Sequence, residues 1–127
     1  MVCYGEVDHD TKKLLMGKAK ALLQPAKPYN PYEQFPFMDI LPMTLIESGL
    51  CGTGGIGFSE GGVPEIIEHG VNGFLCKDKE EMVEAMRHVD EIKPRTCREH
   101  MEKHFGYIRM AKDYLQLSDR VASGMWW

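Results

Sequence analysis

The chain has 127 residues, of which 43% are hydrophobic and 9% aromatic, and this composition is typical of one modest globular domain rather than a disordered segment. Its formal net charge of −4 shows none of the positive charge that is typical of nucleic-acid-binding proteins, and no apolar run is long enough to span a membrane. Acidic residues interrupt the first ten positions, which excludes a signal-peptide pattern there.

The first part of the chain alternates short apolar runs with a helical pattern. Residues 2–4 and 21–24 are predicted strands, and residues 10–20 between them are helix-like, with Asp10 as the candidate N-cap. Four prolines make residues 25–38 a loop. The aromatic side chains of this loop either wall a base or sugar pocket or cover the edge of the sheet as ordinary packing; they are Tyr29, Tyr32, Phe35 and Phe37.

The middle of the chain continues the same rhythm. Strands are predicted at 55–58 and 73–76, with a short helix that has Pro64 in its first turn between them. The pair Gly54-Gly55 offers no side chains for packing, so we expect the first of these strands to be weakened. Strands that alternate with helices in this way predict an α/β fold with a parallel sheet in one domain.

The last third of the chain is predicted to be helical. A capping-box pattern of Asp78 and Glu81 begins one helix, and two more follow on either side of Gly106, over 95–103 and 107–121. Their apolar contacts are expected from Met101, Phe105, Ile108, Ala111, Tyr114 and Leu115.

The cysteines and histidines do not form a metal-binding pattern. The four cysteines include no Cys-x-x-Cys pair, and we expect them to be reduced thiols in a cytoplasmic protein. His100 and His104 have an i, i+4 spacing, but a solvated helix face explains this spacing better than a zinc site.

The residues that indicate chemistry lie between Asp39 and Glu65. Seven residues separate Asp39 from a second carboxylate, Glu47, and Pro42 reads as the first residue of a helix that extends to Leu50. The free N–H groups at such a helix start favour anions such as phosphate, and Glu47 lies about one turn inside. The spacing therefore suits a phosphate-bearing ligand whose hydroxyl groups reach acidic partners.

This stretch resembles the donor-sugar site of retaining glycosyltransferases of family four. The matching blocks are Glu47-Ser-Gly-Leu-Cys-Gly-Thr, Gly61-Gly-Val-Pro-Glu and Ile66-Ile-Glu-His-Gly-Val-Asn-Gly-Phe-Leu75, in this order. The resemblance covers most of the chain but only part of the family's C-terminal domain. It implies a hexosyltransferase-class enzyme and a Rossmann-like parallel sheet, a partial C-terminal domain of the two-domain arrangement called GT-B, with a helical C-terminal third. Residues 1–122 would form this domain and residues 123–127 a tail.

The resemblance also implies roles for individual residues. Glu47 would hold the ribose hydroxyls of a nucleotide sugar, and Asp39, where the family usually has Glu, would hold the hydroxyls of the sugar. These two are the candidate catalytic residues. The resemblance also implies that the leaving phosphate acts as the base, so no side-chain nucleophile is expected. The candidate donor-binding residues are Leu41, Pro42, Met43, Thr44 and Glu47, with the N–H groups of Met43 and Thr44 facing the diphosphate. No cofactor and no metal are implied beyond the nucleotide-diphosphate sugar itself.

A complete domain of this family begins with two further strand–helix units, which carry basic residues for the diphosphate. Residues 2–4 would then be strand three of the order 3-2-1-4-5-6, unpaired, and two sheet edges would be bare. We expect the chain to self-associate, to pair with the missing N-terminal part as a separate chain, or to belong to a longer protein, and to be inactive alone. Three functions stay open: a glycosyltransferase portion, a non-catalytic remnant or interaction module, and a nucleotide-sugar epimerase.

Overall fold

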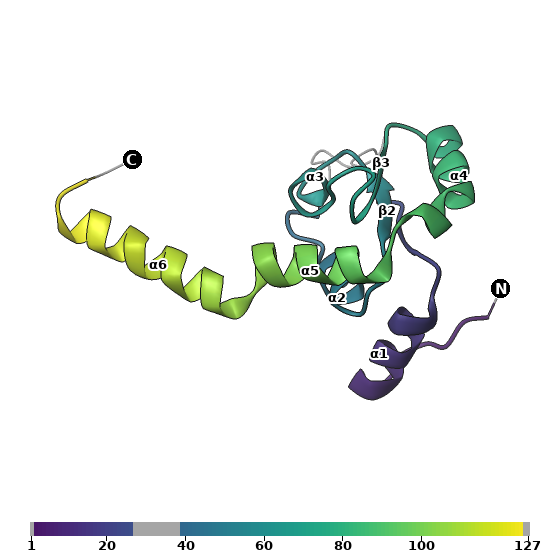
Figure 1. Cartoon of the computed structure of the whole chain (residues 1–127), viewed down its shortest axis with the longest axis horizontal. Helices are drawn as coiled ribbons and strands as arrows, with labels where there is room; N and C mark the ends of the chain where they lie inside the picture. The colour runs from purple at the N-terminus through teal and green to yellow at the C-terminus, as the bar shows by residue number, and fades with distance from the viewer. Residues whose placement is uncertain (1, 27–38, 126–127) are drawn as a thin grey trace, which may run out of the picture.

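The computed structural model describes residues 2–26 and 39–125. Three parallel strands, β1 (Leu22–Gln24), β2 (Gly55–Phe58) and β3 (Gly73–Cys76), form one sheet in the order β1-β2-β3. Helices lie on both faces of this sheet, and the last helix runs out from the body (Figure 1). The prediction of a Rossmann-like α/β fold with a helical C-terminal third is therefore confirmed.

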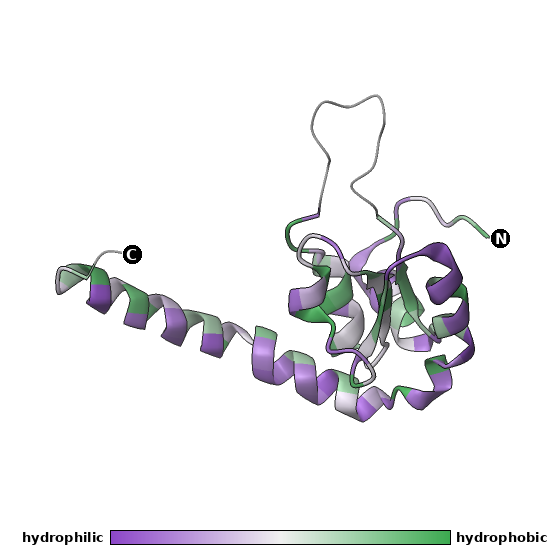
Figure 2. Ribbon diagram, turned by 90° about the horizontal axis from the view of Figure 1, so that it is seen from above, coloured by the Kyte–Doolittle hydropathy of each residue, from purple (hydrophilic) through white to green (hydrophobic). Residues whose placement is uncertain are grey.

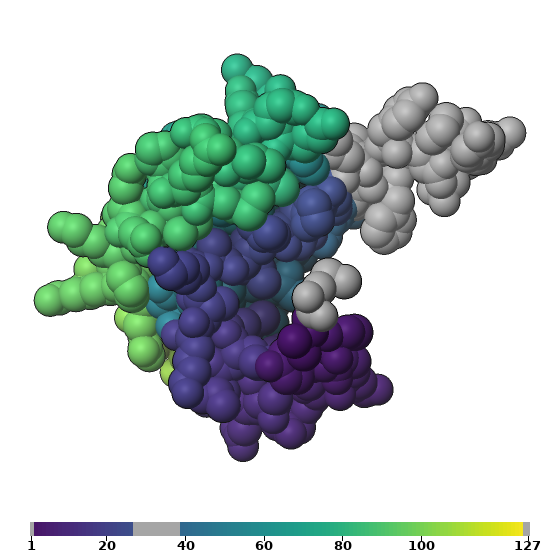
Figure 3. Space-filling view, turned by 90° about the vertical axis from the view of Figure 1, so that its right-hand side faces the viewer, coloured from purple at the N-terminus to yellow at the C-terminus, as the bar shows by residue number. Residues whose placement is uncertain are grey.

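Residues 2–4 are one of the four strands that the sequence predicts, but they do not form a strand. The sheet of the described residues has three strands, and residues 2–4 are exposed in the purple N-terminal segment on the outside of the molecule (Figure 3). In the order 3-2-1-4-5-6 the observed strands correspond to four, five and six, whereas strand three pairs only with strand two. A short run without a neighbouring strand has no partner for its backbone hydrogen bonds, so it stays outside the sheet.

The helices occupy the predicted ranges with shifts at their ends. They are α1 (His9–Lys18), α2 (Met43–Leu50), α3 (Val63–Ile66), α4 (Lys79–Arg87), α5 (Pro94–Phe105) and α6 (Tyr107–Ala122), with a 3-10 turn η1 (Val89–Glu91). The predicted cap of α1 is wrong: Asp8 rather than Asp10 caps it, because Asp8 Oδ1 accepts the Thr11 N–H at 2.8 Å. The predicted cap of α4 is confirmed, since Asp78 Oδ1 accepts the Glu81 N–H at 2.8 Å.

The two sides of β2 carry residues of different size. Ile56 and Phe58 pack in the cluster under α4, whereas Gly55 and Gly57 face α2 and α3. A Cβ on Gly55 would lie 2.5 Å from Leu45 Cδ2 of α2, and one on Gly57 would lie 2.9 Å from a methyl carbon of α3. The strand expected to be weak is thus the buried central strand, and its glycines allow two helices to lie directly on its backbone.

Two hydrophobic clusters hold the helices on the sheet. The cluster under α2, α3 and α5 contains Leu45, Ile46, Val63, Ile66, Ile67 and Met101. The cluster under α4 contains Ile56, Phe58, Phe74, Cys76, Met82 and Ala85. Of the apolar contacts expected from the C-terminal third, Met101 is buried and Phe105 packs against the first cluster, but α6 buries none of its residues. The expectation is therefore wrong for the α6 residues Ile108, Ala111, Tyr114 and Leu115, which are exposed.

Candidate functional site

The segment that enters α2 lies at the carboxyl edge of the sheet, where ligands bind in open α/β sheets. Asp39 Oδ2 accepts a hydrogen bond from Nε2 of Gln24, the last residue of β1, at 3.3 Å. The backbone oxygen of Asp39 accepts the Gly62 N–H at 3.0 Å. A Cβ on Gly62 would collide with the backbone oxygen of Ile40, so this close approach requires glycine. The turn after β2 therefore fixes where the chain enters α2.

Helix α2 begins one residue later than the sequence predicts. Pro42 takes the N-cap position, with φ −68° and ψ 89°, and Met43 is the first helical residue. The ring of Pro42 is buried and caps nothing, and within residues 2–26 and 39–125 no side chain accepts the N–H groups of Met43 and Thr44. Thr44 is exposed, and Leu41 and Met43 expose about half of their surface beside this start. An anion can therefore reach the first turn of α2.

Glu47 lies one turn into α2, on the side that faces α1. Its Oε1 accepts a hydrogen bond from Lys12 Nζ at 2.8 Å, and each side chain is about one-third exposed, 35% for Glu47 and 36% for Lys12. The carboxylate is thus presented at the surface and oriented by a cation. The sequence gives no signal for this pair, because only the packing of α1 beside α2 brings the two residues together.

The predicted site residues follow one path from β1 into α2. Asp39 and Glu47 have separate partners, Gln24 and Lys12, so each carboxylate is held independently of the other. Between them lies the uncapped helix start. Sequence reasoning missed Gln24 and Lys12. The loop aromatics, for which a pocket wall and a cover of the sheet edge were both open, lie outside the described residues.

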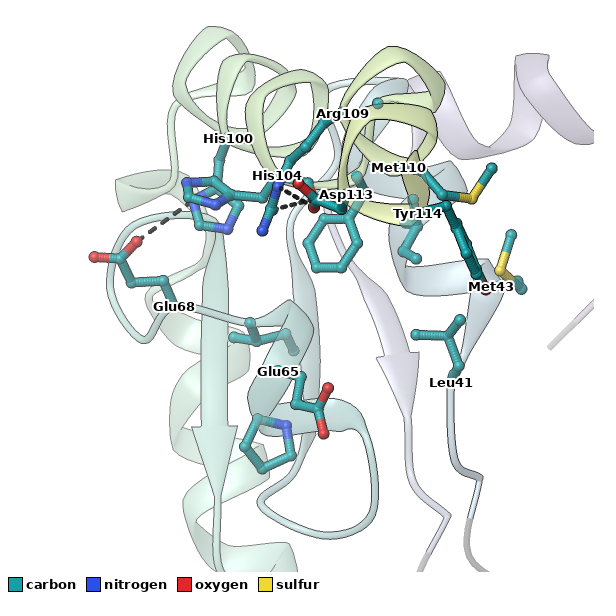
Figure 4. Close-up of a pocket in the computed structure, with 15 residues that line it drawn as sticks. Leu41, Met43, Glu65, Glu68, His100, His104, Arg109, Met110, Asp113 and Tyr114 are labelled. Carbon is teal, nitrogen blue, oxygen red and sulfur yellow. Dashed lines mark hydrogen bonds and ion pairs between the residues drawn. The ribbon is translucent and has the colours of Figure 1, made fainter. Parts of the chain in front are cut away.

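A cavity of about 900 Å³ opens next to this path, between the start of α2, α3 and the α5–α6 junction (Figure 4). Leu41 and Met43 form one wall, and His100 and His104, with ring centroids 4.6 Å apart, form part of another. Burial lowers the pKa of His100, as does His104, while the nearby Glu68 carboxylate opposes this shift from 3.4 Å. The two histidines thus line a cavity and do not merely cover a solvated helix face.

The family of the chain follows from a match along most of its length. The family model described as "Glycosyl transferases group 1" matches residues 2–104. The chain belongs to this family. The matched range includes both carboxylates, their partners and the glycine-rich turn. The site described above therefore lies within the residues that the family model matches, whereas α6 begins after them.

Two known proteins show how much of a group 1 glycosyltransferase this chain represents. N-acetyl-alpha-D-glucosaminyl L-malate synthase of Bacillus anthracis is 46% identical over 35 residues, which are 28% of this chain and 9% of that protein. The structure of sucrose-phosphate synthase from Thermosynechococcus elongatus is similar with a TM-score of 0.67 and 19% identity, over 95% of this chain and 30% of that chain. The glycosyltransferase chain therefore has the fold of a GT-B domain portion and spans less than a third of either relative.

The described part of this glycosyltransferase chain contains neither a metal-binding cluster nor a membrane-spanning helix. Within 2–26 and 39–125, no three side chains of His, Cys, Asp or Glu are grouped so that they hold a metal ion. Among the helices formed by these residues, none combines the length and the apolar character needed to cross a bilayer.

Proposed function

We propose that this chain is the donor-binding portion of a glycosyltransferase that uses a nucleotide-activated sugar. The observation that carries the proposal is the start of α2, which is uncapped and flanked by Asp39 and Glu47 at the carboxyl edge of the sheet. A helix start attracts phosphate, and carboxylates accept hydrogen bonds from hydroxyl groups. A sugar linked to a nucleoside diphosphate presents both kinds of group to this one surface.

Each residue has a distinct role in this proposal. Glu47 accepts hydrogen bonds from the two ribose hydroxyls, while Lys12 fixes the orientation of its carboxylate from α1. Asp39, anchored to β1 by Gln24, accepts hydrogen bonds from the hydroxyls of the sugar. The first-turn N–H groups of α2 face the diphosphate. Transfer retains the configuration of the sugar, and the leaving phosphate acts as the base.

Sugar transfer belongs to a longer enzyme in this proposal, because the chain spans 30% of the sucrose-phosphate synthase chain that shares its fold. Orientation of the acceptor toward the donor supplies much of the rate of such a reaction. The chain alone is therefore expected to bind a donor at about millimolar affinity or weaker, roughly −4 kcal/mol, and to transfer no sugar.

The test is titration calorimetry with UDP and with UDP-N-acetylglucosamine, a donor of the N-acetylglucosaminyl group named in the Bacillus anthracis relative. Glu47→Gln removes one charge-assisted acceptor, a loss of roughly 1.5–3 kcal/mol, so it should weaken binding of both ligands by about tenfold or more. Asp39→Asn should weaken binding of the nucleotide sugar and leave UDP unchanged, because its partner is the sugar. Glu80→Gln, which removes an exposed carboxylate on α4, is the matched control and should change neither.

Three outcomes would count against the proposal or against the expectations drawn from it. No detectable binding by the wild-type chain at millimolar ligand would favour the interaction-module alternative. Binding that Glu47→Gln leaves unchanged would show that the ligand lies elsewhere. Turnover by the purified chain would overturn the expectation that this portion only binds.

A further inference from the structure

Strand β3 is one edge of the described sheet, because the strand order is β1-β2-β3. The backbone oxygens of Asn72 and Cys76 accept N–H groups from β2 and the residue that follows it, at 3.3 and 2.9 Å. Successive residues of a strand turn their backbone groups to opposite sides, so Gly73, Leu75 and Lys77 turn theirs outward. An edge strand with free outward groups is a template for pairing with another strand.

Outward groups of β3 already have partners from residues close by in the chain. One partner is a backbone N–H, and the other two are side chains that accept a backbone N–H. The contacts are Gly70 N–H to Gly73 O at 2.8 Å, Leu75 N–H to His69 Nδ1 at 3.1 Å, and Lys77 N–H to Glu81 Oε2 at 2.9 Å. A further strand could pair along this edge only by displacing these partners.

His69 is held at this edge by its ring as well as by its nitrogen. The ring packs edge-to-face on Phe74, with centroids 5.5 Å apart and an interplanar angle of 82°. Its Nδ1 accepts the Leu75 N–H, so this nitrogen carries no proton. The adjacent Glu68 carboxylate pairs instead with His100 of α5, at 3.4 Å. His69 is exposed, so protons reach its ring from solvent.

We propose that His69 closes the outer edge of β3 to pairing with a further strand, and that protonation of His69 opens it. A protonated imidazole has a donor at each nitrogen, so Nδ1–H would face the Leu75 N–H and the contact is lost. Closure is therefore complete while the ring is neutral and is lost as the pH falls through the range in which histidine side chains change charge, roughly pH 8 to 5. The contacts at Gly73 and Lys77 involve no histidine and keep their partners.

Other titratable groups face His69 across a hollow of about 590 Å³ between β3 and α4. Figure 2 shows α4 at the right, beside the strands, with hydrophilic residues on its outer side. Hydrogen bonds to Glu91 and Glu84 raise the pKa of His88, a second histidine whose titration must be separated from that of His69. The titratable groups that line the hollow with His69 are Cys76, Lys77, Glu81, Glu84 and His88.

The first test follows the Leu75 amide and the His69 ring of the whole chain by NMR between about pH 8 and pH 5. At the upper end, Nδ1 of His69 should have the nitrogen chemical shift of an unprotonated, hydrogen-bonded acceptor. The protection of the Leu75 amide against hydrogen exchange should fall by about fivefold as the ring takes up its proton, because one hydrogen bond is lost. The Phe74 amide, which faces β2, should keep its protection.

Substitutions at position 69 separate the acceptor from the proton. His69→Asn keeps an acceptor that does not titrate, so the Leu75 amide should stay protected at both ends of the pH range. His69→Ala has no acceptor and should leave this amide poorly protected at both ends. His88→Gln is the control and should respond as the wild type does. Equal protection of Leu75 in the wild type at both ends, or in His69→Ala and the wild type at the upper end, would overturn the proposal, as would loss of the response in His88→Gln.

The second test asks whether the closed edge excludes a further strand. Sedimentation equilibrium at about pH 8 compares the wild-type chain with His69→Asn and His69→Ala. The free edge of β1 is the same in all three proteins, so a difference in self-association reports the edge of β3. His69→Ala should associate about fivefold more tightly than the wild type, and His69→Asn should match the wild type. His69→Ala that associates no more tightly than the wild type would overturn the proposal.

Discussion

Two glycines of this chain lie in opposite surroundings. Gly62 donates its N–H to the backbone oxygen of Asp39, and a Cβ there would collide with the backbone oxygen of Ile40. Gly17 lies inside α1, where the nearest atom to a Cβ would be Cys51 O at an ordinary 3.9 Å. The first glycine is needed for the close approach of two backbones, and the second only weakens a helix.

Alanine at these two positions should therefore have effects of opposite sign. Gly62→Ala should lower the free energy of unfolding by about 1–3 kcal/mol, because the backbone that enters α2 must shift to make room. Gly17→Ala should raise it by about 0.5–1 kcal/mol. Urea unfolding followed by circular dichroism measures both, and Gly62→Ala as stable as wild type would show that the turn does not fix the entry to α2.

At the scale of the secondary-structure elements, α5 docks on the body through a few side chains. Cys97 and Met101 are 0% and 2% exposed, whereas most of the helix faces solvent. Cys97 Sγ donates to the backbone oxygen of Asn72 at 3.4 Å, next to the start of β3. Burial of this thiol raises its pKa from 9.0 to about 11. Loss of this proton at high pH is therefore expected to weaken the docking of α5 on the body.

The stability of the chain should accordingly fall as the pH rises. The folded state holds the Cys97 proton more tightly than the unfolded state does, so this contribution is complete below pH 9 and is lost between pH 9 and about pH 11. The two-unit shift in the pKa of Cys97 corresponds to about 3 kcal/mol of stability. Unfolding under reducing conditions should show that the stability difference between wild type and Cys97→Ala shrinks by this amount over that interval. Cys3→Ala, at an exposed position, is the control, and a constant difference for Cys97→Ala would contradict the expectation.

The whole molecule consists of a layered body and one helix that does not share its core. Both hydrophobic clusters lie against the three-stranded sheet, and every residue of β2 is buried. Helix α6 buries none of its residues. Local opening of α6 therefore exposes no core, so α6 is expected to unfold at a lower free-energy cost than the sheet.

Hydrogen exchange should display this division. In dilute solution the amides of α6 should exchange many times faster than those of β2, because α6 opens without unfolding the sheet. Protection of α6 equal to that of β2 at low concentration would contradict the description of the molecule as a body with a separate helix.

Local pattern determined much of this protein. Apolar runs and turn residues predicted three of the strands, α2 and the division of the last helices at Gly106, because each depends on residues that are neighbours in the chain. The carboxylates Asp39 and Glu47 and the glycine-rich turn were recognisable because their meaning lies in order and spacing. Their chemical roles stay predictions.

Only the tertiary structure decided the rest, because those features depend on what lies opposite. Residues 2–4 have strand-like composition, but they form no strand since no neighbouring strand pairs with them. The glycines of β2 predict weakness locally, yet they are where Leu45 reaches the sheet. Lys12 meets Glu47 across 35 residues, a contact that no local spacing encodes. The apolar residues of α6 are evident from its sequence, but only the packing of every other element shows that the described chain leaves them uncovered.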